Sequence, residues 1–150
     1  MALHIRSMTQ TYDTAQNPVY SFIIPVYNEQ ESLGELHRRL SALMGGLDGG
    51  AEAVLVDDGS RDASYALLLE LNAIDPRFKV VHFSRNFGKE VAVSAGLDLA
   101  TGDAVVLLDA DLQDPPELVL EMAKRWREGY DMVYAKRDRR LDETWFKRVS

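Results

Sequence analysis

Short apolar runs alternate with amphipathic stretches along most of this chain of 150 residues, and no other feature restricts its fold as much. The runs are residues 20–26, 53–56, 78–83, 104–108 and 131–135. They are continuously apolar and rich in β-branched or aromatic side chains, which is typical of strands that are buried on both faces. We therefore expect five parallel strands.

The stretches between the runs have the three- and four-residue apolar spacing of helices with one buried face. Leu33, Leu36, Leu40, Leu43 and Leu47 mark the first helix, and Ala63, Ala66, Leu67, Leu71 and Ile74 mark the second. A third is expected over residues 89–100. A fourth is expected to start at Asp114, because an Asp N-cap followed by Pro at the first helical position is a typical start signal.

Strands and helices in this order predict an α/β fold, a doubly wound and mostly parallel sheet with helices on both faces. A hydrophobic fraction of 46% in 150 residues suffices for one core and one domain. We expect residues 20–135 to form that domain. Residues 1–19 show no sustained apolar period and are expected to be a flexible leader.

The composition excludes several classes of protein. The absence of cysteine rules out a disulfide framework and a thiolate metal site, and favours a reducing compartment. There is no signal-peptide pattern and no run of the roughly 18 apolar residues that a membrane-spanning helix needs, so these residues are expected to be soluble. A net charge of −7 argues against a general nucleic-acid binder.

Residues 136–150 differ from the rest in charge, because they carry six basic side chains and only three acidic ones. A basic segment suits a partner with anionic phosphate or anionic lipid. A solvated surface segment would have the same composition.

Polar side chains follow every apolar run, where each strand is expected to end. They are residues 27–29, 57–60, 84–89, 109–114 and 136–137. Because ligands of open parallel sheets bind beyond the carboxyl ends of the strands, one end of the sheet should carry most functional groups. Arg85, Lys89 and Arg137 are cations there and candidates to neutralise phosphate, with solvated surface charge as the alternative for Arg85 and Lys89.

Asp109 and Asp111 are two residues apart, so an extended backbone would place both carboxylates on one side of the chain. Two carboxylates this close repel each other unless a cation lies between them or one is protonated. Such oxygen ligands suit Mg²⁺ or Mn²⁺, completed by the phosphates of a nucleotide. The alternative is that Asp111 only stabilises a turn and Asp114 only caps the next helix.

Asp57 and Asp58 are expected to point to opposite sides of their strand, with Gly59 allowing a sharp turn behind them. One of the two carboxylates would then face a ligand and accept hydrogen bonds from a ribose or a base. The same run is also typical of a turn that caps a helix near Ser60.

Signatures of other enzyme classes are absent from the sequence. No Gly-x-Ser-x-Gly, Walker loop or Gly-x-Gly-x-x-Gly follows the first run, so hydrolase, P-loop and dinucleotide-binding hypotheses lose their main support. His4, His37 and His82 have no metal-ligand spacing, and packing or surface roles are favoured for them.

Four motifs follow one another along the chain: residues 23–29 (IIPVYNE), 56–60 (VDDGS), 84–89 (SRNFGK) and 109–117 (DADLQDPPE). Together they resemble family 2 glycosyltransferases of the dolichyl-phosphate mannosyltransferase and bacterial polyprenyl-phosphate glycosyltransferase group. The resemblance covers about residues 20–140. It implies a GT-A fold, the Rossmann-like fold of transferases that use nucleotide diphosphate sugars.

The resemblance also assigns roles to individual residues. In the nucleotide-binding pocket it implies Pro25, Tyr27, Glu29, Asp57, Asp58, Lys89 and Ala110. Around Mg²⁺ or Mn²⁺ it implies Asp109, Asp111 and Gln113. Arg137 falls where the family has an arginine near the phosphates, so catalysis is expected to depend on Asp109, Asp111 and Arg137.

The implied reaction is the inverting transfer of a sugar from a UDP- or GDP-linked donor to a polyprenyl phosphate, either undecaprenyl or dolichyl phosphate. The expected place is the membrane surface, at the cytoplasmic face of the inner membrane. Members of this group continue through an interface helix and often transmembrane helices. Residues 136–150 are therefore expected to lead to an acceptor and membrane region that is missing here, and these 150 residues to transfer sugar poorly by themselves.

Three other hypotheses stay open at this point. A family 2 transferase that acts on a saccharide hydroxyl would need a carboxylate base, which the family places beyond position 150. A phospho-receiver domain would use Asp57 or Asp58 with Asp109 and Lys136, but has one strand and helix fewer before its acidic pair. An inactive nucleotide-binding remnant would have the same motifs.

Overall fold

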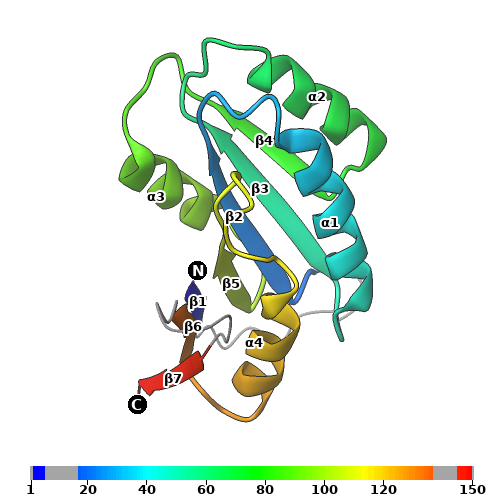
Figure 1. Cartoon of the computed structure of the whole chain (residues 1–150), viewed down its shortest axis with the longest axis vertical. Helices are drawn as coiled ribbons and strands as arrows, with labels where there is room; N and C mark the ends of the chain where they lie inside the picture. The colour runs from blue at the N-terminus through cyan, green and yellow to red at the C-terminus, as the bar shows by residue number, and fades with distance from the viewer. Residues whose placement is uncertain (1, 6–16, 137–144, 150) are drawn as a thin grey trace.

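Residues 2–5, 17–136 and 145–149 are described here from a computed structural model of the chain (Figure 1). The first elements in chain order are β1 (Ala2–Ile5), β2 (Tyr20–Val26), α1 (Leu33–Gly46), β3 (Ala51–Asp57), α2 (Ser64–Ile74) and β4 (Phe78–His82). They are followed by α3 (Lys89–Leu99), β5 (Ala104–Leu107), α4 (Leu118–Arg127), β6 (Met132–Lys136) and β7 (Trp145–Val149).

The described strands form one sheet in the order β4-β3-β2-β5-β1-β6-β7. Its larger part is parallel, because β2 pairs in parallel with both β3 and β5, and β3 pairs in parallel with β4. Its smaller part is antiparallel: β1 lies between β5 and β6 and runs opposite to both, and β7 continues the sheet beside β6.

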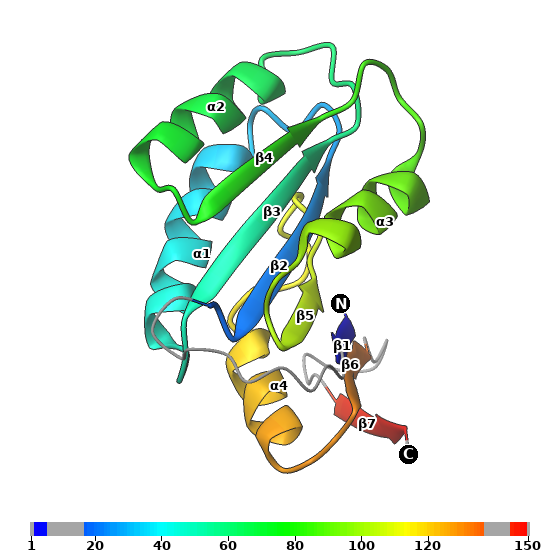
Figure 2. The same cartoon turned by 180° about the vertical axis from the view of Figure 1, so that it is seen from behind.

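The predicted α/β fold with helices on both faces of a mostly parallel sheet is confirmed (Figures 1 and 2). Helices α1, α2 and α4 contribute Leu36, Leu68 and Met122 to one hydrophobic core, which includes Phe22 and Ile24 of the central strand. Helix α3 covers the other face, where Ala92 packs with Ile23, Val54 and Val56. Alternate residues of β2 thus face opposite layers, as the strand period requires.

The expectation of a flexible leader over residues 1–19 is wrong for residues 2–5, which form β1. A four-residue strand is too short to show a period, and β1 is fixed by pairing with β5 on one side and β6 on the other. The fifth apolar run does form a strand, β6, but β1 separates it from the parallel strands. Strand β7 lies within the predicted basic segment.

The fourth helix begins at Leu118 with Glu117 at the N-cap, so the prediction of a start at Asp114 is wrong. The reason is the second proline: Pro116 disfavours helical backbone at Pro115, which therefore does not open the helix. A preceding turn, with hydrogen bonds from Leu118 N to Pro115 O and from Val119 N to Pro116 O, leads into the helix.

Gly96 lies at a close contact between helix α3 and the sheet. A Cβ atom built at Gly96 would lie 2.4 Å from Cγ2 of Ile23 on the central strand. A side chain at this position would displace the Ile23 side chain, the helix or the strand. The close approach sets the position of the first turn of α3, and hence of Lys89, relative to the end of β2.

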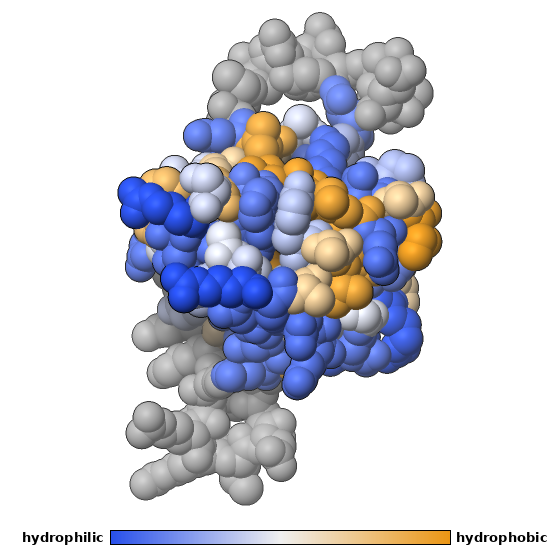
Figure 3. All heavy atoms as spheres, turned by 90° about the horizontal axis from the view of Figure 1, so that it is seen from above, coloured by the Kyte–Doolittle hydropathy of each residue, from blue (hydrophilic) through white to orange (hydrophobic). Residues whose placement is uncertain are grey.

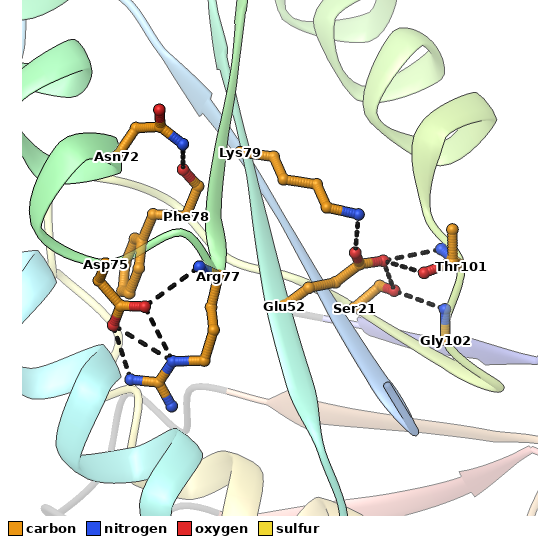
Figure 4. A network of polar contacts seen from close by, with 9 residues as sticks. All are labelled: Ser21, Glu52, Asn72, Asp75, Arg77, Phe78, Lys79, Thr101 and Gly102. Carbon is orange, nitrogen blue, oxygen red and sulfur yellow. Dashed lines mark hydrogen bonds and ion pairs between the residues drawn. The ribbon is translucent and has the colours of Figure 1, made fainter. Parts of the chain in front are cut away.

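A buried carboxylate ties the sheet together at the amino-terminal end of β3 (Figure 4). Glu52 is 4% exposed and accepts hydrogen bonds from Ser21 Oγ, from both the backbone N–H and the hydroxyl of Thr101, and from Nζ of Lys79. Ser21 Oγ in turn accepts the backbone N–H of Gly102. The network links β2, β3 and β4 to the connection between α3 and β5.

Burial alone would raise the pKa of Glu52, but the hydrogen bonds from Lys79, Ser21 and Thr101 outweigh it and hold the pKa below its usual value.

In the part of the chain that the structure describes, no helix has the length and apolar character needed to cross a bilayer.

We predict that Glu52→Gln lowers the free energy of unfolding by about 1–3 kcal/mol at neutral pH, because an amide N–H₂ then faces hydrogen-bond donors. The ionised Glu52 stabilises the fold fully above the unfolded-state pKa of about 4.3, and this contribution is lost as pH falls through the lower folded-state pKa. Urea unfolding should therefore show the gap between wild type and variant narrowing below about pH 4.

Glu70→Gln is the matched control, because Glu70 is exposed on α2. It should leave the urea midpoint nearly unchanged at neutral pH. If Glu52→Gln had the same free energy of unfolding as wild type, the network would have no stabilising role.

Candidate functional site

The carboxyl ends of the parallel strands β2, β3, β4 and β5 meet at one end of the sheet, and the loops that follow them gather there (Figure 1). Figure 3 shows this end from above, with a hydrophobic band among mostly hydrophilic residues. Tyr27 and Phe87 are large side chains exposed in these loops, at 41% and 45%. This is the end at which ligands of open α/β sheets bind.

A pocket of about 170 Å³ opens at this end between β2 and the segment after β5. It is lined by Pro25, Val26, Tyr27, Glu29, Asp58, Lys89, Asp109, Ala110 and Asp111. Eight of these nine are residues to which the resemblance assigns a role in the site. Val26 was not predicted, because an apolar residue inside a strand gives no signal that it also borders a pocket.

Asp57 and Asp58 face opposite sides, as expected for neighbours at the end of a strand, and only Asp58 lines the pocket. Asp58 is 3% exposed, and its carboxylate accepts the backbone N–H groups of Phe87 at 2.7 Å and Gly88 at 3.0 Å. It thereby fixes the loop between β4 and α3. Gly59 behind it has φ 69°, and a Cβ there would lie 2.4 Å from the carbonyl carbon of Arg85.

Asp57 is fully buried and does not line the pocket, in contrast to the role that the resemblance implies. Its Oδ2 lies 2.6 Å from Nδ1 of His82, and its Oδ1 accepts the backbone N–H of Ser60. The His82 ring stacks on Tyr65 at a centroid distance of 3.9 Å. Asp57 therefore holds the His82 ring and the turn at Ser60 in this structure, and that turn precedes α2 rather than opening it.

The loops after β2 and β3 are joined by side chain to backbone hydrogen bonds in both directions. Asn28 accepts from the backbone of Arg61, and Gln30 accepts from the backbone of Ala63. In return, the backbone N–H groups of residues 28, 29 and 30 donate to the side chains of Ser60, Ser64 and Asp62. This pairing was not predicted, and it fixes Glu29 at the pocket. Only the density of Asn, Gln, Ser and Asp in both loops could have suggested it.

Asp109 and Asp111 both line the pocket, although not through the extended backbone that the sequence suggested. Strand β5 ends at Leu107, residues 110 and 111 form a turn, and Leu112 has φ 58°. Asp111 Oδ1 accepts the backbone N–H of Gln113. Asp109 Oδ1 lies 2.6 Å from Nζ of Lys89, so the cation beside this carboxylate is an ammonium group.

The described residues contain no group of three or more His, Cys, Asp or Glu side chains arranged to hold a metal ion. Two carboxylates in one pocket still fit Mg²⁺, which typically takes one or two protein carboxylates and completes its shell with water and phosphate oxygens. Gln113 is exposed and does not line the pocket.

The remaining predicted cations are not brought to the pocket within the described residues. The guanidinium of Arg85 lies over the ring of Phe87, 4.2 Å from its centroid. Arg137 lies outside the described residues, as does the side chain of Lys136.

Residues 21–150 match the sequence profile described as "Glycosyl transferase family 2". The chain is 50% identical over 129 residues to the uncharacterized glycosyltransferase YkcC of Bacillus subtilis (strain 168), covering 86% of this chain and 40% of that protein. It is 46% identical over 126 residues to the undecaprenyl-phosphate 4-deoxy-4-formamido-L-arabinose transferase of Pseudomonas syringae pv. syringae (strain B728a), covering 83% and 37%. The chain thus spans about two fifths of the length of these relatives.

Two solved structures have a similar fold. The mannosyltransferase PcManGT from Pyrobaculum calidifontis, in complex with GDP-Man and Mn²⁺, has a TM-score of 0.59 and 25% identity, covering 79% of this chain and 35% of that one. S. aureus TarS 1-349 in complex with UDP-GlcNAc has a TM-score of 0.59 and 26% identity, covering 74% and 31%.

We predict that Asp58→Ala frees the loop of residues 84–88, because it removes the acceptor for two backbone N–H groups. Loss of charged hydrogen bonds worth about 1.5–3 kcal/mol corresponds to amide exchange about 10 to 150 times faster at Phe87 and Gly88. Hydrogen exchange followed by NMR measures this directly.

Asp62→Ala is the control, because Asp62 accepts the backbone N–H groups of Gln30 and Ser64 in the neighbouring loops. It should accelerate exchange at those two amides and leave Phe87 and Gly88 protected. Unchanged exchange at Phe87 and Gly88 in Asp58→Ala would show that Asp58 does not hold the loop.

Proposed function

Because this chain belongs to family 2 of the glycosyl transferases, we propose that its pocket binds the nucleotide diphosphate of a sugar donor and that the enzyme transfers the sugar to a polyprenyl phosphate. The observation that carries the proposal is the pocket itself, in which Tyr27, Glu29 and Asp111 converge at the carboxyl ends of parallel strands. The solved complexes with GDP-Man and UDP-GlcNAc support the donor class. The undecaprenyl-phosphate transferase supports the acceptor class.

The lining residues suit the parts of such a donor. Pro25 and the exposed ring of Tyr27 offer apolar surface to a base, and Glu29 offers an acceptor to hydroxyl groups. Asp58 fixes the loop beside the pocket through Phe87 and Gly88.

The carboxylates of Asp109 and Asp111 would hold Mg²⁺ or Mn²⁺ together with the donor phosphates, which agrees with the Mn²⁺ in the PcManGT complex. Such an ion supplies Lewis-acid stabilisation of the departing nucleotide diphosphate. Gln113 is not assigned to the ion, because it lies outside the pocket lining.

A polyprenyl phosphate requires little acid–base chemistry from the protein. Its second pKa is near 6, so its oxygen is ionised at neutral pH and attacks the anomeric carbon without a general base. The protein has to bring two anions together and to orient them. We assign to Arg137 the role of neutralising negative charge where the donor and acceptor phosphates meet. A saccharide hydroxyl as acceptor would need a base instead.

We predict that Asp111→Asn lowers the Mn²⁺-dependent affinity for UDP or GDP by about tenfold or more, since one anionic oxygen ligand is lost while the shape of the side chain is kept. Affinity without metal should stay unchanged. Isothermal titration calorimetry with each nucleotide, with and without Mn²⁺, provides the measurement. Asp98→Asn on the exposed side of α3 is the control, and equal Mn²⁺ dependence in Asp111→Asn would refute the metal assignment.

In the whole protein, radiolabelled sugar should pass from the nucleotide to undecaprenyl phosphate in detergent. Arg137→Ala should lower the transfer rate more than the donor affinity, because its charge acts where donor and acceptor meet. Incorporation only into a saccharide acceptor would favour the alternative family 2 reaction.

A further inference from the structure

Lys89 occupies a position that its own helix disfavours. It is the first residue of α3, directly after Gly88 at the N-cap. The amino-terminal end of a helix carries partial positive charge, so a cation there is unfavourable. The stability of α3 therefore does not explain Lys89. Its side chain reaches across the pocket instead, and its Nζ lies 2.6 Å from Oδ1 of Asp109.

The other charged side chains that line the pocket show why this contact matters. Among the described residues that line the pocket, four are carboxylates, Glu29, Asp58, Asp109 and Asp111, and Lys89 is the single cation. Asp58 is satisfied by backbone N–H groups, and Asp111 accepts one from Gln113. Asp109 is neutralised by the ammonium group of Lys89.

We propose that Lys89 is an exchangeable cation, which neutralises Asp109 while the donor is absent and moves to the donor diphosphate when a divalent cation takes its place. This inference rests on the proposed function, and it adds to that function the order in which charges enter the pocket. The ammonium and a divalent cation compete for the same carboxylate, because like charges so close repel each other.

The exposure of the ion pair fits such an exchange. The side chains of Lys89 and Asp109 are 62% and 49% exposed. Ion pairs this exposed stabilise a fold only weakly, so the contact is easily broken by a competing cation. A lysine also suits the movement, because it carries a compact charge on a flexible stem and binds phosphate as a point charge.

The proposal predicts effects of opposite sign for one substitution. Lys89→Gln removes the competitor, so affinity for Mn²⁺ alone should rise about fivefold, the range expected for a surface ion pair. Affinity for UDP or GDP in the presence of Mn²⁺ should fall by a similar factor, because the diphosphate loses a cation. Electron paramagnetic resonance of free Mn²⁺ gives the first constant, and calorimetry gives the second.

Two variants serve as controls. Lys89→Arg keeps the charge, so its affinity for Mn²⁺ alone should stay close to that of wild type. Lys124→Gln removes a lysine of α4 that pairs with Glu121 at 3.7 Å and does not line the pocket, and it should change neither constant. Thermal denaturation checks that each variant is folded.

The outcomes separate this inference from the proposed function. If wild type binds Mn²⁺ and nucleotide but Lys89→Gln binds Mn²⁺ alone no more tightly, the exchange is refuted and the proposed function stands. Weaker binding of Mn²⁺ alone by Lys89→Gln would also overturn it, because Lys89 would then organise the metal site. If wild type binds neither UDP nor GDP at any Mn²⁺ concentration, the cation exchange and the proposed function are both wrong.

Discussion

The pairing of β2 with β5 stops at Ile23 and Leu107, whereas the pairing of β2 with β3 continues to Val26 and Asp57. The pocket depends on this difference. Beyond Leu107 the chain leaves the sheet and turns, so the last residues of β2 have a neighbouring strand on one side only. Pro25 is tolerated in a central strand for the same reason, because it lies where the ladder to β5 has already ended.

The pocket is bordered by loops whose shape is fixed by polar contacts, partly buried at Asp58 and Ser64 and exposed at Asn28 and Gln30. Asp58 accepts two N–H groups of the loop before α3, and the loops after β2 and β3 exchange hydrogen bonds in both directions. Backbone groups in loops need partners when water is excluded. Those partners are side chains here, so the loop that carries Tyr27 and Glu29 and the loop that leads to Lys89 are held in place without a ligand, which would reduce the ordering cost of binding one.

Continuous apolar runs allowed the parallel strands to be predicted, because burial on both faces leaves a strong signal. The spacing of apolar residues between the runs predicted the first three helices, which bury one face. Strand β1 was missed because its four residues are fixed by partners distant in sequence. The start of α4 was misplaced because Pro116 overrides the cap signal of Asp114 and Pro115. In the candidate site, the motifs singled out most of the pocket lining, but not that Asp57 faces His82, nor that Lys89 reaches Asp109.

Glu52 and Asp109 lie at opposite ends of the parallel sheet, and the two carboxylates have different partners. Glu52, at the amino-terminal end, is buried and receives hydrogen bonds from Ser21, Thr101 and Lys79, so its charge serves the fold. At the other end, Asp109 is about half exposed and has a single exposed ammonium as its partner. A carboxylate satisfied as completely as Glu52, which already has Lys79 as its cation, would have no capacity left for a further one. In the proposed site, the weak satisfaction of Asp109 therefore leaves its carboxylate accessible to a charged ligand, at the expense of stability that a more fully paired site would provide.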